Sequence, residues 1–259
     1  MITLTIDGRE IKAKDGATIL ETAREHKIEI PTLCYHEAIS SAGACRICSV
    51  EVIRGDRSRI AAACVSPVEP GLVVKTNTEV ITNLRKVLIE LLLARCPKVK
   101  AIQDLAHKFK VKKTDFKTED EDCILCGMCV RVCEQIVGKS AISLVNRGTK
   151  REVATPFYEA SSACIGCGSC AVVCPTGCIK VEDIGDKRTI KKWKAEFKLQ
   201  QCKMCGKYFA PEAQLEYLAK ALNLPEKEFE ICQNCRVILG KISKAEEQKS
   251  EQMKKLSLS

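Results

Sequence analysis

The cysteines constrain this chain more than any other feature. Eighteen of them occur in 259 residues, a share of roughly 7% that approaches the level typical of scaffolds built on cross-links or metals. All but Cys96 and Cys178 fall into spaced sets of four. We expect these two remaining cysteines to be small buried hydrophobic residues.

The N-terminus and the apolar stretches of the sequence indicate the compartment. The first eight residues lack the basic and apolar regions of a signal peptide, and the most apolar stretch, Val87–Ala94, is short and interrupted by Glu90. We expect a cytoplasmic protein with no membrane span, whose reduced thiols are metal ligands.

The formal charge of the chain is +9. Four filled thiolate-ligated centres would add about −8 and leave the protein nearly neutral, so we expect no nucleic-acid partner.

The first cysteine set has the spacing x10, x2 and x15 and comprises Cys34, Cys45, Cys48 and Cys64. Plant-type ferredoxins likewise take three thiolates from one loop and the fourth from a distant strand. The small residues Gly43 and Ala44 leave room for backbone amides to approach the sulfurs. We predict a [2Fe–2S] cluster here, with zinc as the alternative.

The next two sets repeat the motif C-x2-C-x2-C-x3-C, which is typical of bacterial two-cluster ferredoxins. In those proteins the fourth cysteine of each motif binds the other cluster. We therefore assign one [4Fe–4S] cluster to Cys123, Cys126, Cys129 and Cys174. The second [4Fe–4S] cluster is assigned to Cys164, Cys167, Cys170 and Cys133.

The last set consists of two C-x2-C pairs and comprises Cys202, Cys205, Cys232 and Cys235. Four thiolates leave no open coordination position, which favours structural zinc (Zn2+) in a docking module. A further iron–sulfur cluster, a rubredoxin-like iron or no metal are the alternatives.

Hydrophobic periodicity and turn residues predict an α+β fold. Expected strands are Ile2–Ile6, Glu10–Ala13, Val50–Ile53 and Leu72–Lys75. Three helices are expected. The first follows a Thr18/Glu21 capping box, the second covers Glu79–Arg95, and the third covers Pro211–Leu222. The second helix carries one apolar stripe, made of Val80, Leu84, Val87, Leu88, Leu91 and Leu92. We divide the chain into five segments. A [2Fe–2S] β-grasp domain with a trailing helix (1–95) is followed by a helical basic connector (96–118) and a two-[4Fe–4S] ferredoxin domain (119–185). A four-cysteine metal module (186–240) opens with the basic connector Asp186–Lys198, and a charged, disordered tail (241–259) ends the chain.

The stretches IPTLCYHEAISSAGACRICSVEV and AACVSPVEPGLVVKT resemble a [2Fe–2S] domain shared by three groups of proteins. These are NADH dehydrogenase large subunits, diaphorase subunits of NAD-linked hydrogenases, and the N-terminal part of multi-cluster iron hydrogenases. The segment LLLARCPKVKAIQDLAHKF lacks the histidine and three cysteines of the extra cluster in the large subunits, so we expect that cluster to be absent. We also expect no hydrogen-activating or molybdopterin domain after the ferredoxin repeat.

The resemblance implies an iron–sulfur electron-transfer subunit of an NAD(P)H-linked hydrogenase complex, which bifurcating assemblies also contain. Implied partners are a flavin- and NAD(P)H-binding subunit, a hydrogenase or formate dehydrogenase catalytic subunit, and soluble ferredoxin. Since the sequence shows no nucleophile–base pair, open three-ligand metal site or dinucleotide loop, we expect no catalytic residue in this chain. The alternatives are the same role in a formate dehydrogenase complex, a free-standing polyferredoxin, and a redox-sensing or assembly adaptor.

Overall fold

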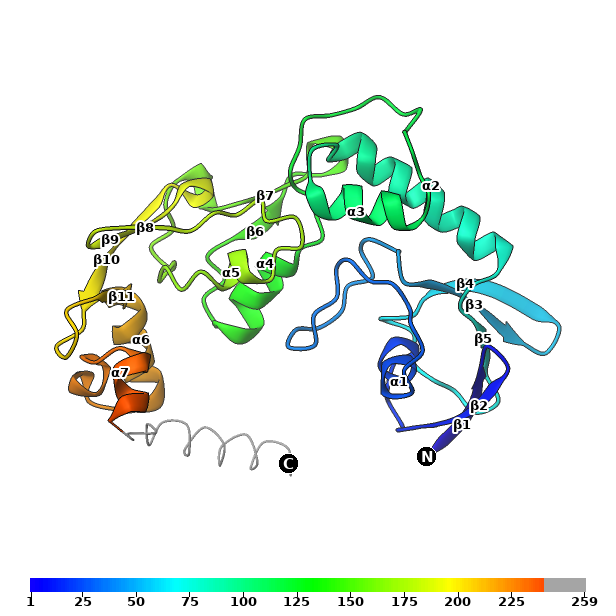
Figure 1. Cartoon of the computed structure of the whole chain (residues 1–259), viewed down its shortest axis with the longest axis horizontal. Coiled ribbons are helices and arrows are strands. Elements are labelled where there is room, and N and C mark those ends of the chain that lie inside the picture. The colour runs from blue at the N-terminus through cyan, green and yellow to red at the C-terminus, as the bar shows by residue number, and fades with distance from the viewer. Residues whose placement is uncertain (240–259) are drawn as a thin grey trace. The chain divides into compact units, whose positions relative to one another are not determined.

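A computed structural model describes residues 1–239, and the predicted tail 241–259 lies outside the described residues. The chain divides into two compact units (Figure 1). Unit 1 comprises Met1–Gly138, Leu144–Val153 and Val172–Cys178. Unit 2 comprises Lys139–Ser143, Ala154–Ala171 and the described residues from Ile179 onward. Within residues 1–239, none of the helices combines the length and hydrophobicity that crossing a bilayer requires.

Unit 1 begins with the predicted β-grasp domain. Its sheet has the order β2-β1-β5-β3-β4, with β1 parallel to β5 and the other neighbours antiparallel. The strands are β1 (Ile2–Ile6), β2 (Arg9–Ala13), β3 (Ser49–Arg54), β4 (Arg57–Ala62) and β5 (Val73–Lys75). Helix α1 (Ile19–Glu25) begins at the predicted capping box, in which Thr18 and Glu21 exchange hydrogen bonds. Strand β4 was not among the predicted strands.

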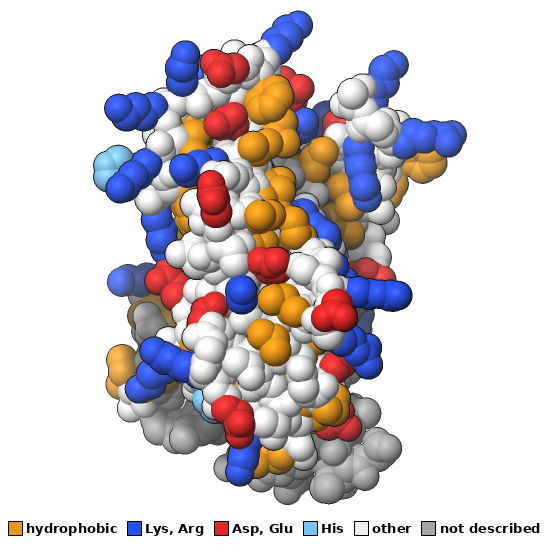
Figure 2. Space-filling view, turned by 90° about the vertical axis from the view of Figure 1, so that its right-hand side faces the viewer, with side chains coloured by type: hydrophobic (Ala, Val, Ile, Leu, Met, Phe, Trp, Pro, Cys, Tyr) orange, Lys and Arg blue, Asp and Glu red, His pale blue; other side chains and the backbone are white. Residues whose placement is uncertain are grey.

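Two further helices follow the sheet, α2 (Glu79–Arg95) and α3 (Lys100–Lys108). The bounds predicted for α2 are confirmed, but only half of its predicted apolar stripe faces the core. Leu84, Leu88 and Leu92 are partly buried, and Leu88 and Leu92 pack against buried clusters. Val80, Val87 and Leu91 are exposed, and Figure 2 shows hydrophobic side chains lying among charged ones on the surface. The buried residues are Ile81, Arg85, Ile89 and Ala94. The buried Arg85 guanidinium donates to the carbonyls of Ile47 and Ser49 at 3.1 and 2.8 Å.

The ferredoxin segments consist mainly of loops with short elements. These are α4 (Met128–Arg131), a π-turn (Val132–Ile136), β6 (Ser143–Val145), a 3-10 turn (Gly148–Lys150), β7 (Glu152–Ala154), a 3-10 turn (Pro156–Tyr158) and α5 (Ser169–Val172). Strands β6 and β7 form a two-stranded sheet. Such short elements suit segments that wrap around a prosthetic group rather than around an apolar core.

Unit 2 contains a second sheet with the order β11-β10-β9-β8. Its strands are β8 (Glu182–Ile184), β9 (Lys187–Ile190), β10 (Ala195–Gln201) and β11 (Tyr208–Pro211), and a 3-10 turn (Lys191–Trp193) joins β9 to β10. The prediction of a connector over Asp186–Lys198 is therefore wrong. Buried Ile190, Trp193 and Ala195 anchor this charged segment as a hairpin. The module ends with α6 (Glu212–Leu222), a 3-10 turn (Glu226–Phe229) and α7 (Gln233–Ile238).

Candidate metal centres

The four cysteines of the first set come together in unit 1 as two pairs. The Cys45 amide donates to Cys34 Sγ at 3.3 Å, and the Sγ atoms of Cys48 and Cys64 lie 3.4 Å apart. Cys48 directly precedes β3 and Cys64 follows β4, so the antiparallel pairing of these strands brings the two thiols together. A binuclear cluster needs two terminal thiolates at each iron, and this arrangement fits that need.

Hydrogen bonds favour a thiolate in each pair. The bond from Cys45 lowers the pKa of Cys34, and the bond from Cys64 lowers the pKa of Cys48, whereas burial opposes both shifts. The same contacts and burial raise the pKa of Cys45 and Cys64. Each pair thus holds one thiolate and one thiol, and the thiol must lose its proton when a metal binds.

The first ferredoxin motif also lies in unit 1, together with Cys174 of the second motif. The Leu125 amide donates to Cys123 Sγ at 3.4 Å. Burial raises the pKa of Cys126 to about 11, and the nearby thiols of Cys34, Cys174 and Cys123 raise it further. Val173, which precedes Cys174, packs in the same hydrophobic cluster as Cys126. The assignment of Cys174 to the first cluster stays a prediction.

Cys178 also lies at this site. Its Sγ and the Oγ1 of Thr176 are each 3.5 Å from Cys174 Sγ. Hydrogen bonding to Cys178 is the largest of several contributions that lower the pKa of Cys174 to about 4, against the effect of burial. Cys178 is only half-buried, so the expectation that it is a simple core residue is wrong. Cys96, by contrast, is fully buried, as expected.

The [2Fe–2S] candidate site and the first [4Fe–4S] candidate site are neighbours. Cys34 and Cys126 belong to one hydrophobic cluster, with Ile39, Met128, Val132 and Val173. The two loops are tied by Ser40 and Gln135, whose backbone and side-chain hydrogen bonds measure 2.9 and 2.6 Å. Residues of the two ligand sets thus pack together within one compact unit.

Arg131 lies at this contact and was not identified from the sequence. Its Nη1 donates to the Cys126 carbonyl at 3.1 Å, and its charge contributes to the lowered pKa of Cys34. Its Nε and Nη2 are buried and have no hydrogen-bond partner in the described part of the chain. Buried guanidinium N–H groups without partners are costly, and acceptors on bound clusters would satisfy them. This orphaned donor pair therefore fits the proposed cofactors.

We predict that Arg131→Met lowers the reduction potential of the [2Fe–2S] cluster by about 60 mV, because a nearby positive charge stabilises the added electron. An EPR-monitored redox titration measures the shift. Arg131→Lys should keep most of the potential, and Arg57→Met, which removes an exposed charge on β4, should leave it unchanged. Equal potentials in the Met variant and the wild type would contradict the placement of Arg131 at the cluster.

The loop of the second ferredoxin motif lies in unit 2, where Cys170 is buried and Cys164 and Cys167 are half-buried. Gly166 and Gly168 have φ values of +70° and +76°, which let the loop turn sharply without side chains. Cys133, the proposed fourth ligand, lies in the π-turn Val132–Ile136 of unit 1. Its assignment to the second cluster stays a prediction.

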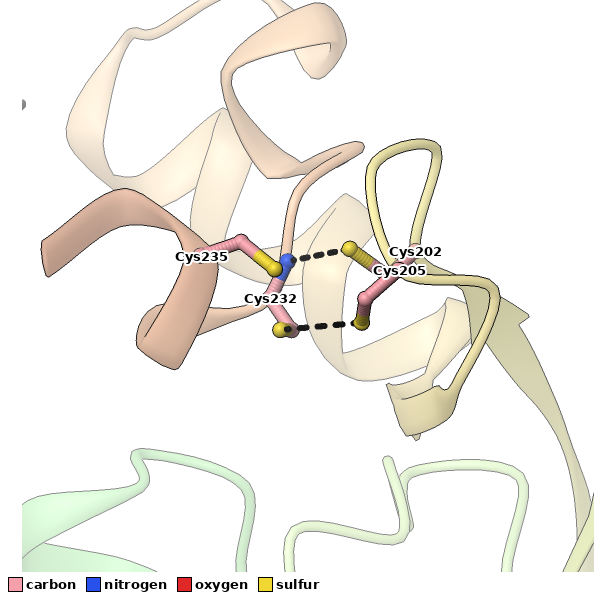
Figure 3. A group of neighbouring side chains, drawn as sticks. All are labelled: Cys202, Cys205, Cys232 and Cys235. Atoms are coloured by element: carbon pink, nitrogen blue, oxygen red, sulfur yellow. Dashed lines mark hydrogen bonds between the residues drawn. The ribbon is translucent and has the colours of Figure 1, made fainter. Parts of the chain in front are cut away.

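The C-terminal cysteines converge most closely. The sulfurs of Cys202, Cys205, Cys232 and Cys235 all lie within 4.8 Å of one another. Cys202 and Cys205 come from the turn after β10, and Cys232 and Cys235 from the start of α7 (Figure 3). The sulfurs of Cys205 and Cys232 are 3.9 Å apart, and the Cys232 amide donates to Cys202 Sγ at 3.3 Å.

This spacing fits one metal ion. Metal–sulfur bonds of about 2.3 Å in a tetrahedron separate the thiolates by roughly 3.8 Å, whereas the iron and sulfide atoms of a cluster would hold them further apart. Among residues 1–239, no other group of three or more potential ligands is drawn together this tightly. The spacing is compatible with a single tetrahedral ion, and the identity of the metal stays a prediction.

Comparison with known proteins identifies two iron–sulfur domains in the chain. Residues 1–79 match a family model described as a 2Fe-2S iron-sulfur cluster binding domain. Residues 163–207 match one described as a 4Fe-4S dicluster domain. This second match contains the second ferredoxin motif and also Cys202 and Cys205, while the first motif lies outside it.

Relatives carry names from two kinds of oxidoreductase. The chain is 35% identical to NADP-reducing hydrogenase subunit HndD of Solidesulfovibrio fructosivorans, over 69% of this chain and 36% of that protein. It is 31% identical to the NADH-ubiquinone oxidoreductase 75 kDa subunit of Reclinomonas americana, over 69% of this chain and 29% of that protein. The chain thus spans only about a third of the length of these relatives.

A solved structure is also similar. One chain of an NAD+-reducing [NiFe]-hydrogenase, in the H2-reduced state, superposes with a TM-score of 0.54 and 31% identity. The match covers 60% of the present chain and 74% of that hydrogenase chain.

Proposed function

Because the chain belongs to the iron–sulfur subunits that NAD(P)-linked hydrogenases share with NADH-ubiquinone oxidoreductases, we propose that it relays single electrons within a cytoplasmic NAD(P)H-linked hydrogenase complex. Its partners in this proposal are a flavin-containing NAD(P)H-binding subunit, a hydrogenase catalytic subunit and soluble ferredoxin.

The observation that carries this proposal is the shared contact between the first two candidate sites. Cys34 and Cys126 are packed in one buried cluster, and the Ser40–Gln135 hydrogen bonds fix the spacing of their loops. When bound, iron–sulfur clusters supply one-electron redox chemistry. The chain's own residues hold the ligand thiolates, exclude water from the space between them and place the Arg131 charge beside both.

The proposed ligands follow the sets described above. The [2Fe–2S] cluster is held by Cys34, Cys45, Cys48 and Cys64, and the first [4Fe–4S] cluster by Cys123, Cys126, Cys129 and Cys174. The second [4Fe–4S] cluster is held by Cys164, Cys167, Cys170 and Cys133. The C-terminal cysteines hold structural zinc, which their close spacing supports.

The exposed face of α2 supports a subunit rather than a mobile carrier. Val80, Val87 and Leu91 are 57%, 46% and 46% exposed, and their spacing of seven and four residues puts them on one side of the helix. A row of exposed apolar residues suits a partner surface. A free-standing polyferredoxin would gain nothing from it.

The test is a metal count on the full chain, purified without oxygen. We expect about 10 iron atoms per chain, matched by acid-labile sulfide, and one binuclear EPR signal after reduction. Fewer than about 8 iron atoms together with no binuclear signal would overturn the cluster assignment. Stable co-purification with flavin-containing and hydrogenase subunits is expected, whereas recovery of the chain alone from the native cell would favour the carrier.

A further inference from the structure

The single tryptophan of the chain is buried against the second ferredoxin motif. Trp193 ends the 3-10 turn between β9 and β10 and is only 2% exposed, although the neighbouring Lys192 and Lys194 are exposed. Its indole Nε1 lies 3.5 Å from Cys170 Sγ and donates a hydrogen bond to it. A buried indole N–H needs an acceptor, and here the acceptor is a proposed cluster ligand.

Two further contacts show that this approach is built into unit 2. The ring of Phe197 on β10 covers Gly166 so closely that a Cβ at Gly166 would lie 2.6 Å from it. Arg188 on β9 donates to the Gly166 carbonyl at 3.1 Å. The Arg188 guanidinium is itself held by both carboxylate oxygens of Asp183, at 2.7 and 2.8 Å. The β9–β10 hairpin therefore contacts the cluster-binding loop at two residues, Cys170 and Gly166.

We infer that Trp193 is a positioning residue for the second [4Fe–4S] cluster, and that its N–H donation to Cys170 raises the potential of that cluster. The inference rests on the proposed function, because it takes Cys164, Cys167 and Cys170 as ligands. A cluster sulfur carries more negative charge in the reduced state, so an N–H donor stabilises that state more. Covering the loop with Trp193 and Phe197 also keeps water away from the ligands. In this inference the C-terminal module sets the potential of the second [4Fe–4S] cluster, and it does so without any change in the oxidation state of its own metal.

The experiment exploits the fact that the chain has one tryptophan. Growth on the benzothiophene analogue of tryptophan replaces the indole N–H by sulfur at residue 193 alone and keeps the ring shape. The anaerobically purified full chain is then titrated by EPR. We expect the equilibrium constant for one-electron reduction of one [4Fe–4S] cluster to fall about fivefold, the effect of one net hydrogen bond. The other [4Fe–4S] cluster and the [2Fe–2S] cluster should keep their potentials.

The controls separate this inference from the proposed function. The iron and acid-labile sulfide contents per chain must equal those of protein made with ordinary tryptophan, which shows that the clusters are assembled. Trp193→Phe should move the same signal in the same direction, since it also lacks the donor. Unchanged potentials in both substituted proteins, or equal shifts of both [4Fe–4S] signals, would overturn the inference while leaving the cluster assignment intact. Absence of a second [4Fe–4S] signal from the ordinary protein would overturn the ligand assignment and the inference with it.

Discussion

Replacing Cys202 and Cys205 together by serine should remove one zinc ion per chain and leave the iron count unchanged. The four sulfurs lie within 4.8 Å of one another, a spacing suited to a single ion. The apolar core around them is small, since Cys202, Cys232 and Cys235 pack only against Phe209 and Ile231 in their cluster. A module of this size obtains most of its folding free energy from the metal, so α6 and α7 should lose their fold in the variant.

The measurement combines metal analysis with assembly. Metal content of the purified variant gives zinc and iron on one sample, and co-purification with neighbouring subunits reports docking, which we expect to weaken. Cys96→Ala is the matched control, because Cys96 is fully buried but lies outside every ligand set. It should keep both metals. Loss of iron with acid-labile sulfide in the double variant would show that the C-terminal site is a redox cluster and that the electron path extends into it.

Local patterns in the sequence were sufficient for much of the fold. The Thr18/Glu21 capping box, the first hairpin and the bounds of α2 follow from residues close together in the chain. These features are encoded within a few residues, so the sequence shows them directly. The cysteines of the last set, grouped by their spacing, converge in the structure, and those of the first set form two contacting pairs. The cluster or ion that each set holds stays a prediction.

Features that depend on distant partners were not predictable. Arg85 is buried and donates to the carbonyls of Ile47 and Ser49, more than 30 residues away, so its side chain takes a place in the buried face of α2 that the apolar pattern did not predict. Strands β9 and β10 were not predicted, because their lysines make the segment look like a polar connector. Only Ile190, Ala195 and Leu199 of that hairpin are buried apolar strand residues, too few to stand out in a charged segment. Arg131 and Trp193 acquire their roles through contacts made in the folded chain.

Replacing Cys133 by serine should damage the second [4Fe–4S] cluster and spare the first, although Cys133 belongs to the first motif. The reciprocal half of this exchange is consistent with two observations. Val172–Cys178 groups with unit 1, which contains the first motif, and Val173 packs in the same hydrophobic cluster as Cys126. If Cys174 completes the first cluster, the loop of Cys164, Cys167 and Cys170 needs a fourth thiolate from elsewhere, and the two-cluster pattern supplies Cys133.

The two crossed cysteines can be tested as a pair. Cys133→Ser and Cys174→Ser should each lose about four iron atoms or lower the stability of one cluster toward oxygen, but they should affect different [4Fe–4S] signals. The signal lost in Cys133→Ser should be the one that moves when the Trp193 N–H is removed, because Trp193 contacts Cys170. If Cys133→Ser instead abolishes the other signal, each motif binds its own cluster and the crossed assignment is wrong. The two variants thus distinguish a crossed pair of clusters, which couples both motifs in one folding unit, from two independent loops.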